Sequence, residues 1–164
     1  MVARHVSVTP ATQALRKAGA AYVEHLYDYV EHGGTAEAAR QLGTDENRVV
    51  KTLLMRDDAG RELIILMHGD CSVSTRNLAR AIGVKSVTPC PPEQAQRVTG
   101  YRVGGISPFG TRKRLPVYVE RSVLSLPSLL INGGRRGYLL EIAPAVLSSL
   151  LEATAVECAL KEAP

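Results

Sequence analysis

The sequence contains no tryptophan, a single phenylalanine and no long apolar run. Its longest uninterrupted apolar stretch, "LIILM" at residues 63–67, is far shorter than the roughly 20 residues that a membrane-spanning helix needs. The first residues also lack the apolar core of a secretory signal. We therefore expect a soluble cytoplasmic protein with no membrane partner.

Cysteine is scarce, and Cys71, Cys90 and Cys158 form no CxxC pair. Three isolated cysteines predict neither a zinc knuckle nor a disulfide framework, and such thiols stay reduced in the cytoplasm. The four histidines show no metal-ligand spacing, and there is no GxSxG nucleophile motif. The sequence thus predicts no metal and no other cofactor. It favours chemistry done by binding and orienting a substrate over attack by a protein nucleophile.

What is present is an ordinary globular composition, with 45% apolar and 22% charged residues in a chain of 164. This apolar content argues against a disordered chain, and the length suits one domain with its own core. We therefore expect a single domain over residues 1–164.

Short helices and short strands alternate along the chain. Helices are expected at residues 10–19, 33–43 (capped by Thr35 and ended by Gly43), 72–83, 91–100 and 144–153. Strands are expected at residues 20–30, 84–89, 115–120, 128–132 and 138–142, and residues 45–69 predict a β-hairpin with its turn at 58–60. This order favours an α/β fold with a mixed sheet over a doubly wound parallel one.

Lys51 is the first candidate site residue, because it is the one charge in the apolar strand "RVVKTLLM". Its side chain either points to solvent along the sheet surface or opens into a pocket. In a pocket its ammonium would hold a carbonyl or phosphate oxygen.

The segment "TGYRVGGISPFGTRKRLP" at residues 99–116 is the second candidate. Gly104 and Gly105 would let the backbone come close to a ligand, and Pro108 would stiffen the second half of the loop. Successive N–H groups in such a loop can converge on an oxyanion or an anion. A structural turn is the alternative.

Positive charge is clustered, although the net charge is only +4. Arg112, Lys113 and Arg114 follow the first glycine pair, and Arg135 and Arg136 follow a second in "INGGRRG". These clusters either contact RNA phosphate or form a solvated basic surface. The "INGGRRG" segment contains neither a P-loop nor a dinucleotide-binding fingerprint.

In order along the chain, "VVKTLL" (49–54), "TGYRVGGISPFG" (99–110), "RLPVYV" (114–119) and "GGRRG" (133–137) resemble the YbaK/EbsC family of aminoacyl-tRNA deacylases. That family is similar to the editing domain inserted in bacterial prolyl-tRNA synthetases. The resemblance implies a mixed α/β fold with a partly barrel-like sheet and peripheral helices. It also implies metal-independent hydrolysis of the ester that joins a wrong amino acid to the 3′ end of tRNA, Cys-tRNA(Pro) being the first candidate.

The resemblance also implies roles for individual residues. Lys51 matches the lysine on which activity in the family usually depends, and Gly104 and Gly105 match the loop that binds the ester carbonyl or the terminal ribose. These three are the implied catalytic residues. The implied substrate-binding residues are Tyr27, Thr52, Ile106, Ser107, Pro108, Asn132 and Gly133. The implied tRNA phosphate contacts are Arg112, Lys113, Arg114, Arg135 and Arg136. Misacylated tRNA is the implied partner, with prolyl- or cysteinyl-tRNA synthetase as a second one.

One departure concerns specificity. Members that act on Cys-tRNA tend to carry aspartate where this chain has Leu139, and often serine at the position of Asn132. If Leu139 faces the pocket, cysteine specificity is in doubt. Two other functions therefore stay open: a tRNA- or synthetase-binding module of the same fold without turnover, and a small-molecule hydrolase.

Overall fold

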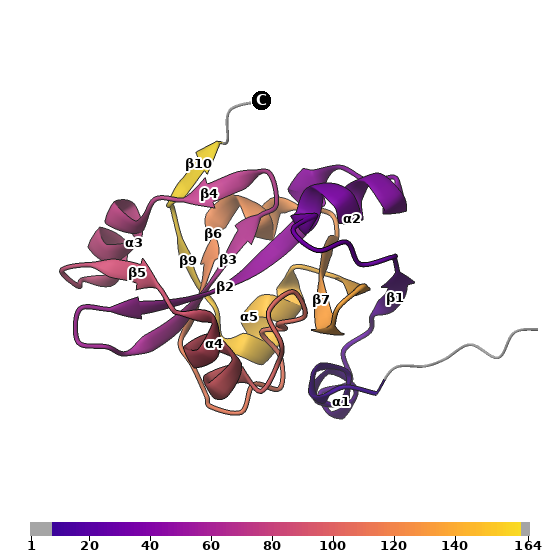
Figure 1. Cartoon of the computed structure of the whole chain (residues 1–164), viewed down its shortest axis with the longest axis horizontal. Helices are drawn as coiled ribbons and strands as arrows, with labels where there is room; N and C mark the ends of the chain where they lie inside the picture. Colours follow the sequence, from indigo (N-terminus) through magenta and orange to yellow (C-terminus); the bar gives the residue numbers. More distant parts are fainter. Residues whose placement is uncertain (1–7, 162–164) are drawn as a thin grey trace, which may run out of the picture.

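The computed structural model describes residues 8–161, which form a mixed sheet with helices on both faces (Figure 1). The eight strands of the sheet are β1 (Val23–Leu26), β2 (Val49–Asp57), β3 (Glu62–His68), β5 (Val87–Pro89), β6 (Val117–Glu120), β7 (Leu129–Arg135), β8 (Tyr138–Ile142) and β9 (Thr154–Val156). Their order is β1-β8-β7-β2-β3-β6-β9, and β5 pairs with the end of β2. A separate two-stranded ribbon joins β4 (Cys71–Val73) to β10 (Ala159–Lys161).

Parallel and antiparallel pairs are mixed across this sheet. The pairs β2–β7, β3–β6 and β6–β9 are parallel, and the remaining pairs are antiparallel. The helices of the described chain are α1 (Pro10–Lys17), α2 (Gly34–Leu42), α3 (Thr75–Ile82), α4 (Pro92–Thr99) and α5 (Ala145–Leu151), with 3₁₀ turns η1 (Glu46–Arg48) and η2 (Arg121–Ser125). The predicted mixed α/β class is confirmed. None of these helices is long and apolar enough to cross a bilayer.

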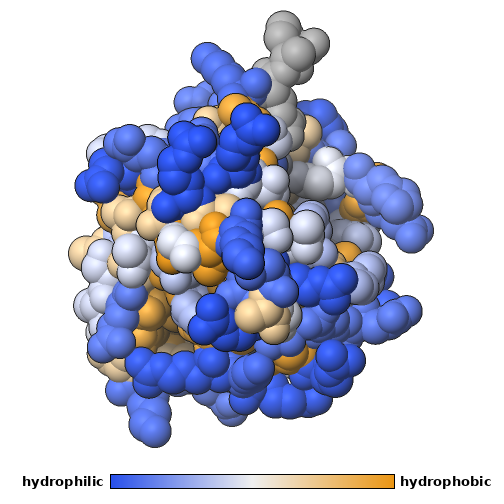
Figure 2. Space-filling model, turned by 90° about the vertical axis from the view of Figure 1, so that its left-hand side faces the viewer, coloured by the Kyte–Doolittle hydropathy of each residue, from blue (hydrophilic) through white to orange (hydrophobic). Residues whose placement is uncertain are grey.

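The strands bury side chains on both faces. On one face, Val50, Leu54 and Ile131 pack with α1, α4 and α5 in the largest apolar cluster, which also holds Phe109. On the other face, alternate residues of the same strands pack under α2 and α3, in two smaller clusters. Seen from the side of α3 and β5, the surface is mostly hydrophilic, with apolar side chains in small scattered groups (Figure 2).

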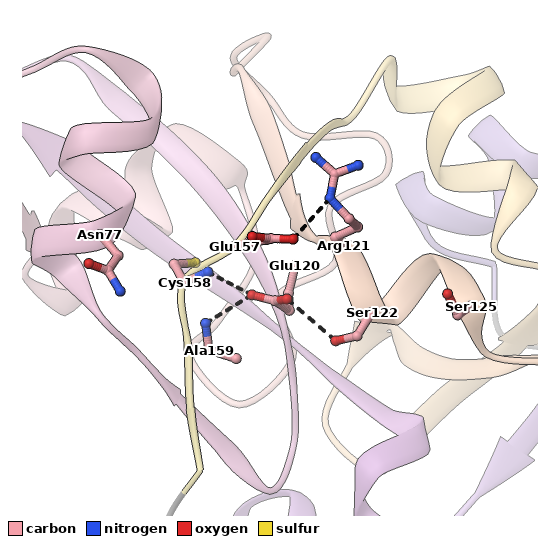
Figure 3. A pocket seen from close by; sticks show the side chains of 8 residues that line it. All are labelled: Asn77, Glu120, Arg121, Ser122, Ser125, Glu157, Cys158 and Ala159. Atoms are coloured by element: carbon pink, nitrogen blue, oxygen red, sulfur yellow. Dashed lines mark hydrogen bonds and ion pairs between the residues drawn. The ribbon is translucent and has the colours of Figure 1, made fainter.

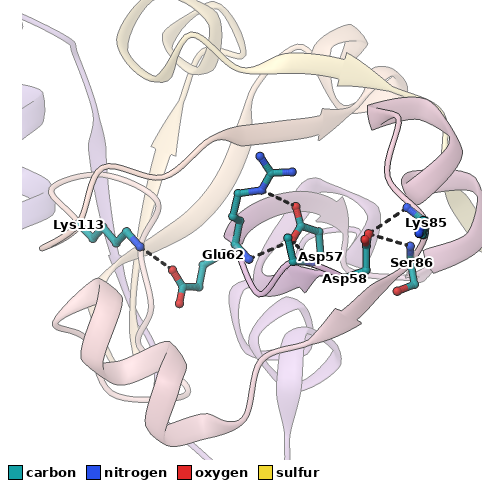
Figure 4. A network of polar contacts seen from close by, with 8 residues as sticks. Asp57, Asp58, Glu62, Lys85, Ser86 and Lys113 are labelled. Carbon is teal, nitrogen blue, oxygen red and sulfur yellow. Dashed lines mark hydrogen bonds and ion pairs between the residues drawn. The ribbon is translucent and has the colours of Figure 1, made fainter.

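The predicted β2–β3 hairpin is confirmed, and its turn is built around Asp57. One carboxylate oxygen of Asp57 accepts the N–H groups of Ala59 and Arg61, each at 2.9 Å. These bonds, with that of the Arg61 side chain, hold the pKa of Asp57 below its usual value. The next carboxylate, Asp58, accepts the Lys85 N–H at 2.9 Å and so ties the turn to the segment before β5 (Figure 4).

Several local predictions were wrong at their boundaries, among them the strand expected at 84–89, which covers only 87–89, and the one expected at 128–132, which runs to 135. Three further differences have a structural cause. Helix α2 is capped at Gly33, and Thr35 lies inside its first turn, where its hydroxyl donates to Glu46 at 2.6 Å. The strand expected at 20–30 covers only 23–26, because its partner β8 begins at Tyr138, opposite Leu26. The helix expected from residue 72 begins at 75, because residues 71–73 pair with β10.

Candidate active site

The sheet brings Lys51 next to Asn132. The parallel pairing of β2 with β7 aligns Val49 with Leu130 and Val50 with Ile131, and Lys51 and Asn132 come one residue further along each strand. Lys51 lies two residues after Val49, and Asn132 two residues after Leu130, so each points to the same face as that residue. Val49 and Leu130 pack under α2. The two polar side chains therefore emerge on the α2 face of the sheet, although they lie 81 positions apart in the sequence.

Lys51 is partly buried, and its ammonium donates a hydrogen bond to the carbonyl oxygen of Cys71 in β4. This bond anchors the end of the side chain over the sheet. The ammonium is therefore held against β4 and does not extend freely into solvent.

Asn132 connects β7 to the loop that contains the first glycine pair. Its amide nitrogen donates to the carbonyl oxygen of Gly104 at 3.3 Å. Its amide oxygen accepts the N–H groups of Gly134 (2.7 Å) and Arg135 (3.1 Å), at a β-bulge that shifts the β7–β8 register between Asn132 and Arg135. Such a bulge re-aims a side chain, and here Asn132 bridges β7 and the glycine loop.

The glycine pair at 104–105 is required by packing. A Cβ atom on Gly105 would lie 2.8 Å from the backbone nitrogen of Arg136, and one on Gly104 would lie 2.7 Å from the hydroxyl of Tyr29. Gly104 also has φ +91°, a conformation that favours glycine. The loop is therefore pressed against the β7–β8 hairpin, and Arg136 strengthens this contact by donating to the Val103 carbonyl at 2.9 Å.

The loop offers some backbone donors and has already used others. The Gly105 N–H donates to the Arg102 carbonyl at 2.8 Å, so it is not available to a ligand. Within residues 8–161, the N–H groups of Gly104 and Ile106 have no hydrogen-bond partner. The Ser107 side chain is fully buried, and its hydroxyl accepts the Phe109 N–H at 3.2 Å. Ser107 therefore shapes the loop and does not present a nucleophile.

Tyr27 and Leu139 give this face an apolar floor. Leu139 lies directly opposite Asn132 in the β7–β8 pair and is 4% exposed. It packs with Val49 and Leu130 and with Tyr27, which lies just beyond β1. Burial is the main cause that raises the pKa of Tyr27, and the neighbouring Tyr29 raises it further, so the Tyr27 phenol stays protonated. The residue that replaces the expected aspartate thus lies on the same face as Lys51.

Thr52 and Gly133 belong to the opposite side of the sheet. Thr52 alternates with Lys51 and pairs with Leu66 of the largest core cluster. Its hydroxyl is buried and has no hydrogen-bond partner in the described chain. Gly133 is covered by the Tyr138 ring, 2.7 Å from where its Cβ would lie. Ile106 packs on the same cluster, and Pro108 is buried.

The five basic residues fall into two separate groups. Arg135 and Arg136 lie at the β7–β8 turn beside the glycine loop, stacked over Tyr138 and Tyr29 at 5.4 and 4.9 Å. Arg112, Lys113 and Arg114 are exposed on the segment that leads to β6. There Lys113 pairs with Glu62 at 2.8 Å (Figure 4), and Arg114 pairs with Glu152 at 3.1 Å. Glu62 pairs with Arg56, so Lys113 lies toward the far end of β2 from Lys51.

No cysteine near the site is activated. Burial raises the pKa of Cys71 and Cys90, and that of Cys158 to about 12. In residues 8–161 no cluster of histidine, cysteine and acidic side chains is suited to a metal ion.

Sequence reasoning missed Tyr29, whose only signal was its spacing two residues from Tyr27.

Comparison with known proteins identifies the family of this chain. The profile of the aminoacyl-tRNA editing domain family matches residues 31–150, a segment that contains β2, the glycine loop and the β7–β8 hairpin. The chain belongs to this family. The match begins beyond Tyr27 and Tyr29, so it does not include those two residues.

The editing domain also resembles individual proteins. It is 29% identical, over 86% of this chain and 87% of the relative, to EbsC of Enterococcus faecalis, a candidate Cys-tRNA(Pro)/Cys-tRNA(Cys) deacylase. A second relative is the proline–tRNA ligase of Syntrophotalea carbinolica. The two sequences are 35% identical over a segment that covers 48% of this chain and 14% of the ligase. The hypothetical protein APE2540 has the same fold, with a TM-score of 0.85, 25% identity, and coverage of 93% of this chain and 100% of that one.

Proposed function

We propose that this editing domain hydrolyses, in trans and without a metal, the ester bond of misacylated tRNA, with a Cys-tRNA(Pro)-type substrate as the first candidate. The observation that carries the proposal is the hydrogen bond from Asn132 to Gly104, with Lys51 at the level of Asn132, one residue beyond the Val50–Ile131 pair. An anchored cation and a rigid loop of backbone donors are what an already activated ester needs.

In this proposal the ester carbonyl lies against the glycine loop. The N–H groups of Gly104 and Ile106 would stabilise the oxyanion of the tetrahedral intermediate. Lys51 would hold the 3′-terminal phosphate or assist the leaving ribose oxygen. The attacking group would be the thiol of the substrate's own cysteine, or a water molecule. This assignment agrees with the raised pKa of Cys71 and the buried position of Ser107.

The amino-acid side chain would meet an apolar floor at Tyr27, which is half-buried and packs with the buried Leu139. An apolar floor suits a small uncharged side chain such as that of cysteine or alanine, because a charged group would be desolvated there without a partner. The 3′-terminal base would find exposed apolar surface at Tyr29, Val30 and Val103, next to Gly104. A base stacked on an aromatic ring is a common mode of single-strand recognition.

The alternative is a tRNA-binding module without turnover. Leu139 is the observation in its favour, because leucine cannot accept hydrogen bonds or balance a positive charge. In that case Arg135 and Arg136 would still bind phosphate, and Lys51 would only brace β4.

A panel of labelled aminoacyl-tRNAs separates these two functions. We expect the wild type to deacylate Cys-tRNA(Pro) or Ala-tRNA(Pro), and Lys51→Ala to lose about 10²- to 10³-fold in rate, as when an electrostatic donor is removed from an active site. Lys85→Ala is the matched control, since Lys85 is exposed beside β5. Equal rates for Lys51→Ala and wild type would refute the assigned site. Binding of tRNA without loss of any aminoacyl group would establish the binding module.

A further inference from the structure

A second group of reactive side chains lies where β3 and β6 end. The Nε2 atom of His68, the last residue of β3, lies 2.7 Å from the Oγ atom of Ser122 in η2. The other ring nitrogen, Nδ1, lies 2.8 Å from the carbonyl oxygen of Asn47. A serine hydroxyl, an imidazole and a fixed acceptor therefore form one hydrogen-bonded chain.

The Asn47 carbonyl determines the tautomer of His68. A carbonyl oxygen only accepts, so Nδ1 of His68 must carry a proton. In the neutral ring Nε2 then has a lone pair, and it must accept the hydrogen bond from the Ser122 hydroxyl. This is the arrangement in which an imidazole removes a proton from a serine nucleophile.

The two residues differ in exposure. His68 is 4% exposed, whereas Ser122 is exposed and lines a cavity of about 540 Å³ (Figure 3). The other residues that line this cavity are Asn77, Glu120, Arg121, Ser125, Glu157, Cys158 and Ala159. None of the residues assigned to tRNA editing is among them.

Glu120 places a negative charge beside this pair. It is 6% exposed, and one of its carboxylate oxygens accepts the N–H groups of Cys158 (2.7 Å) and Ala159 (2.9 Å). The other oxygen lies 3.4 Å from the Ser122 hydroxyl oxygen, further than Nε2 of His68. Ser122 is within reach of donating to this oxygen as well, but with neutral His68 the shorter contact needs the serine proton, and the fixed carboxylate would stabilise the imidazolium that forms.

We propose that Ser122 and His68 form a second catalytic site, separate from the editing site, that hydrolyses small polar carboxylic esters. Ser122 Oγ adds to the ester carbonyl carbon while its proton passes to His68 Nε2. The bond to the alcohol oxygen then breaks, and His68 returns the proton to that oxygen, which leaves an acyl-Ser122 ester. Water, deprotonated by His68, cleaves this ester to give the carboxylic acid and the free serine.

The lining of the cavity defines the class of ester. Two carboxylates, Glu120 and Glu157, contribute to it, and Arg121 pairs with only the second, at 3.4 Å (Figure 3). The uncompensated negative charge would repel an anionic acyl group and favour a neutral or cationic one.

A serine-directed fluorophosphonate tests the proposal on the full chain. We expect a single adduct in the intact mass, mapped to Ser122 by peptide sequencing and not to Ser125, which lines the same cavity. Turnover of 4-nitrophenyl acetate should depend on the same residue. An unlabelled protein, or an adduct on another residue, would overturn the proposal.

Three variants complete the test. Ser122→Ala should lose both labelling and ester turnover, and His68→Gln should lower the labelling rate by about 10²-fold, a typical contribution of a general base. Ser149→Ala, an exposed serine of α5, is the matched control. If His68→Gln does not fold, Ser122→Ala decides alone, because its side chain is at the surface. Ester turnover that Ser122→Ala leaves unchanged would refute the site.

The editing proposal and this proposal are tested by different variants and different assays. Lys51→Ala should keep fluorophosphonate labelling at the wild-type rate, and Ser122→Ala should keep aminoacyl-tRNA deacylation.

Discussion

The substitution Gly105→Ala tests whether the packing of the glycine loop against the β7–β8 hairpin builds the site. The new Cβ atom would lie 2.8 Å from the backbone nitrogen of Arg136 and 2.9 Å from the carbonyl carbon of Arg135. Both neighbours are backbone atoms and cannot rotate away. Gly105 is not among the glycines with positive φ, so alanine adds no backbone strain there. The effect of the substitution is therefore purely steric.

The loop must retreat by about 0.6 Å to reach the 3.4 Å of ordinary contact. Overpacking of this kind destabilises a protein by roughly 1–3 kcal/mol. At roughly 2–4 °C per kcal/mol for a chain of this size, the melting temperature should fall by about 2–12 °C. A displacement approaching 1 Å lowers catalysis by up to about 10²-fold. We therefore expect deacylation to fall about 10- to 100-fold at a temperature where the variant is folded.

Gly60→Ala separates stability from activity. Gly60 has φ +81° and open space around its Cβ position, in the β2–β3 turn. Alanine there should destabilise the fold by about 1–2 kcal/mol through backbone strain alone and leave deacylation unchanged. If Gly105→Ala melts like the wild type, the described packing is wrong. If it is destabilised but deacylates at the wild-type rate, the loop is not part of the active site.

Three further predictions concern charge and protonation. Because the pKa of Asp57 is lowered in the fold, its stabilising effect is present above the usual value of 3.8 and is lost as pH falls through the folded value. The urea midpoints of wild type and Asp57→Ala should therefore converge as pH is lowered, and a constant difference would contradict this. Replacing Arg135 and Arg136 by glutamine should weaken tRNA binding and reduce the slope of log Kd against log salt by roughly 1.4–1.8, if each contacts one phosphate. An unchanged slope would remove both from the interface. Cys158, with a pKa of about 12, should resist iodoacetamide at pH 8 until the chain is unfolded, and fast native alkylation would refute its burial.

Much of the local structure could be predicted because its causes are local. Thr9 caps α1 by accepting the Thr12 N–H at 3.1 Å, as the sequence Thr-Pro indicated. Gly43 and Gly83 end α2 and α3 in the left-handed conformation. The β2–β3 turn forms from residues within four positions of Asp57. Each of these signals lies within one turn of chain, so the sequence is sufficient.

Other features depend on distant partners and left little trace in the sequence. The strands β4, β9 and β10 have three residues each and exist only because another strand pairs with them. The early end of β1 is set by the start of β8, and the burial of the Ser107 hydroxyl is set by the core around Phe109. Propensity and periodicity carry no information on such pairings.

Sequence patterns were sufficient to predict the mixed α/β class and the hairpin, and they identified Lys51, the two glycine pairs and the arginine pair as candidate residues. Which of these residues lie together could be learned only from the folded chain. The parallel β2–β7 pair places Asn132 beside Lys51, and the β7 bulge turns it to Gly104. The fold also directs Thr52 to the opposite face of the sheet, and it brings His68 within hydrogen-bond distance of Ser122, 54 positions away in the sequence. The physical reason is that side-chain neighbours in a sheet are fixed by strand register, and register is set by long-range packing of the whole core.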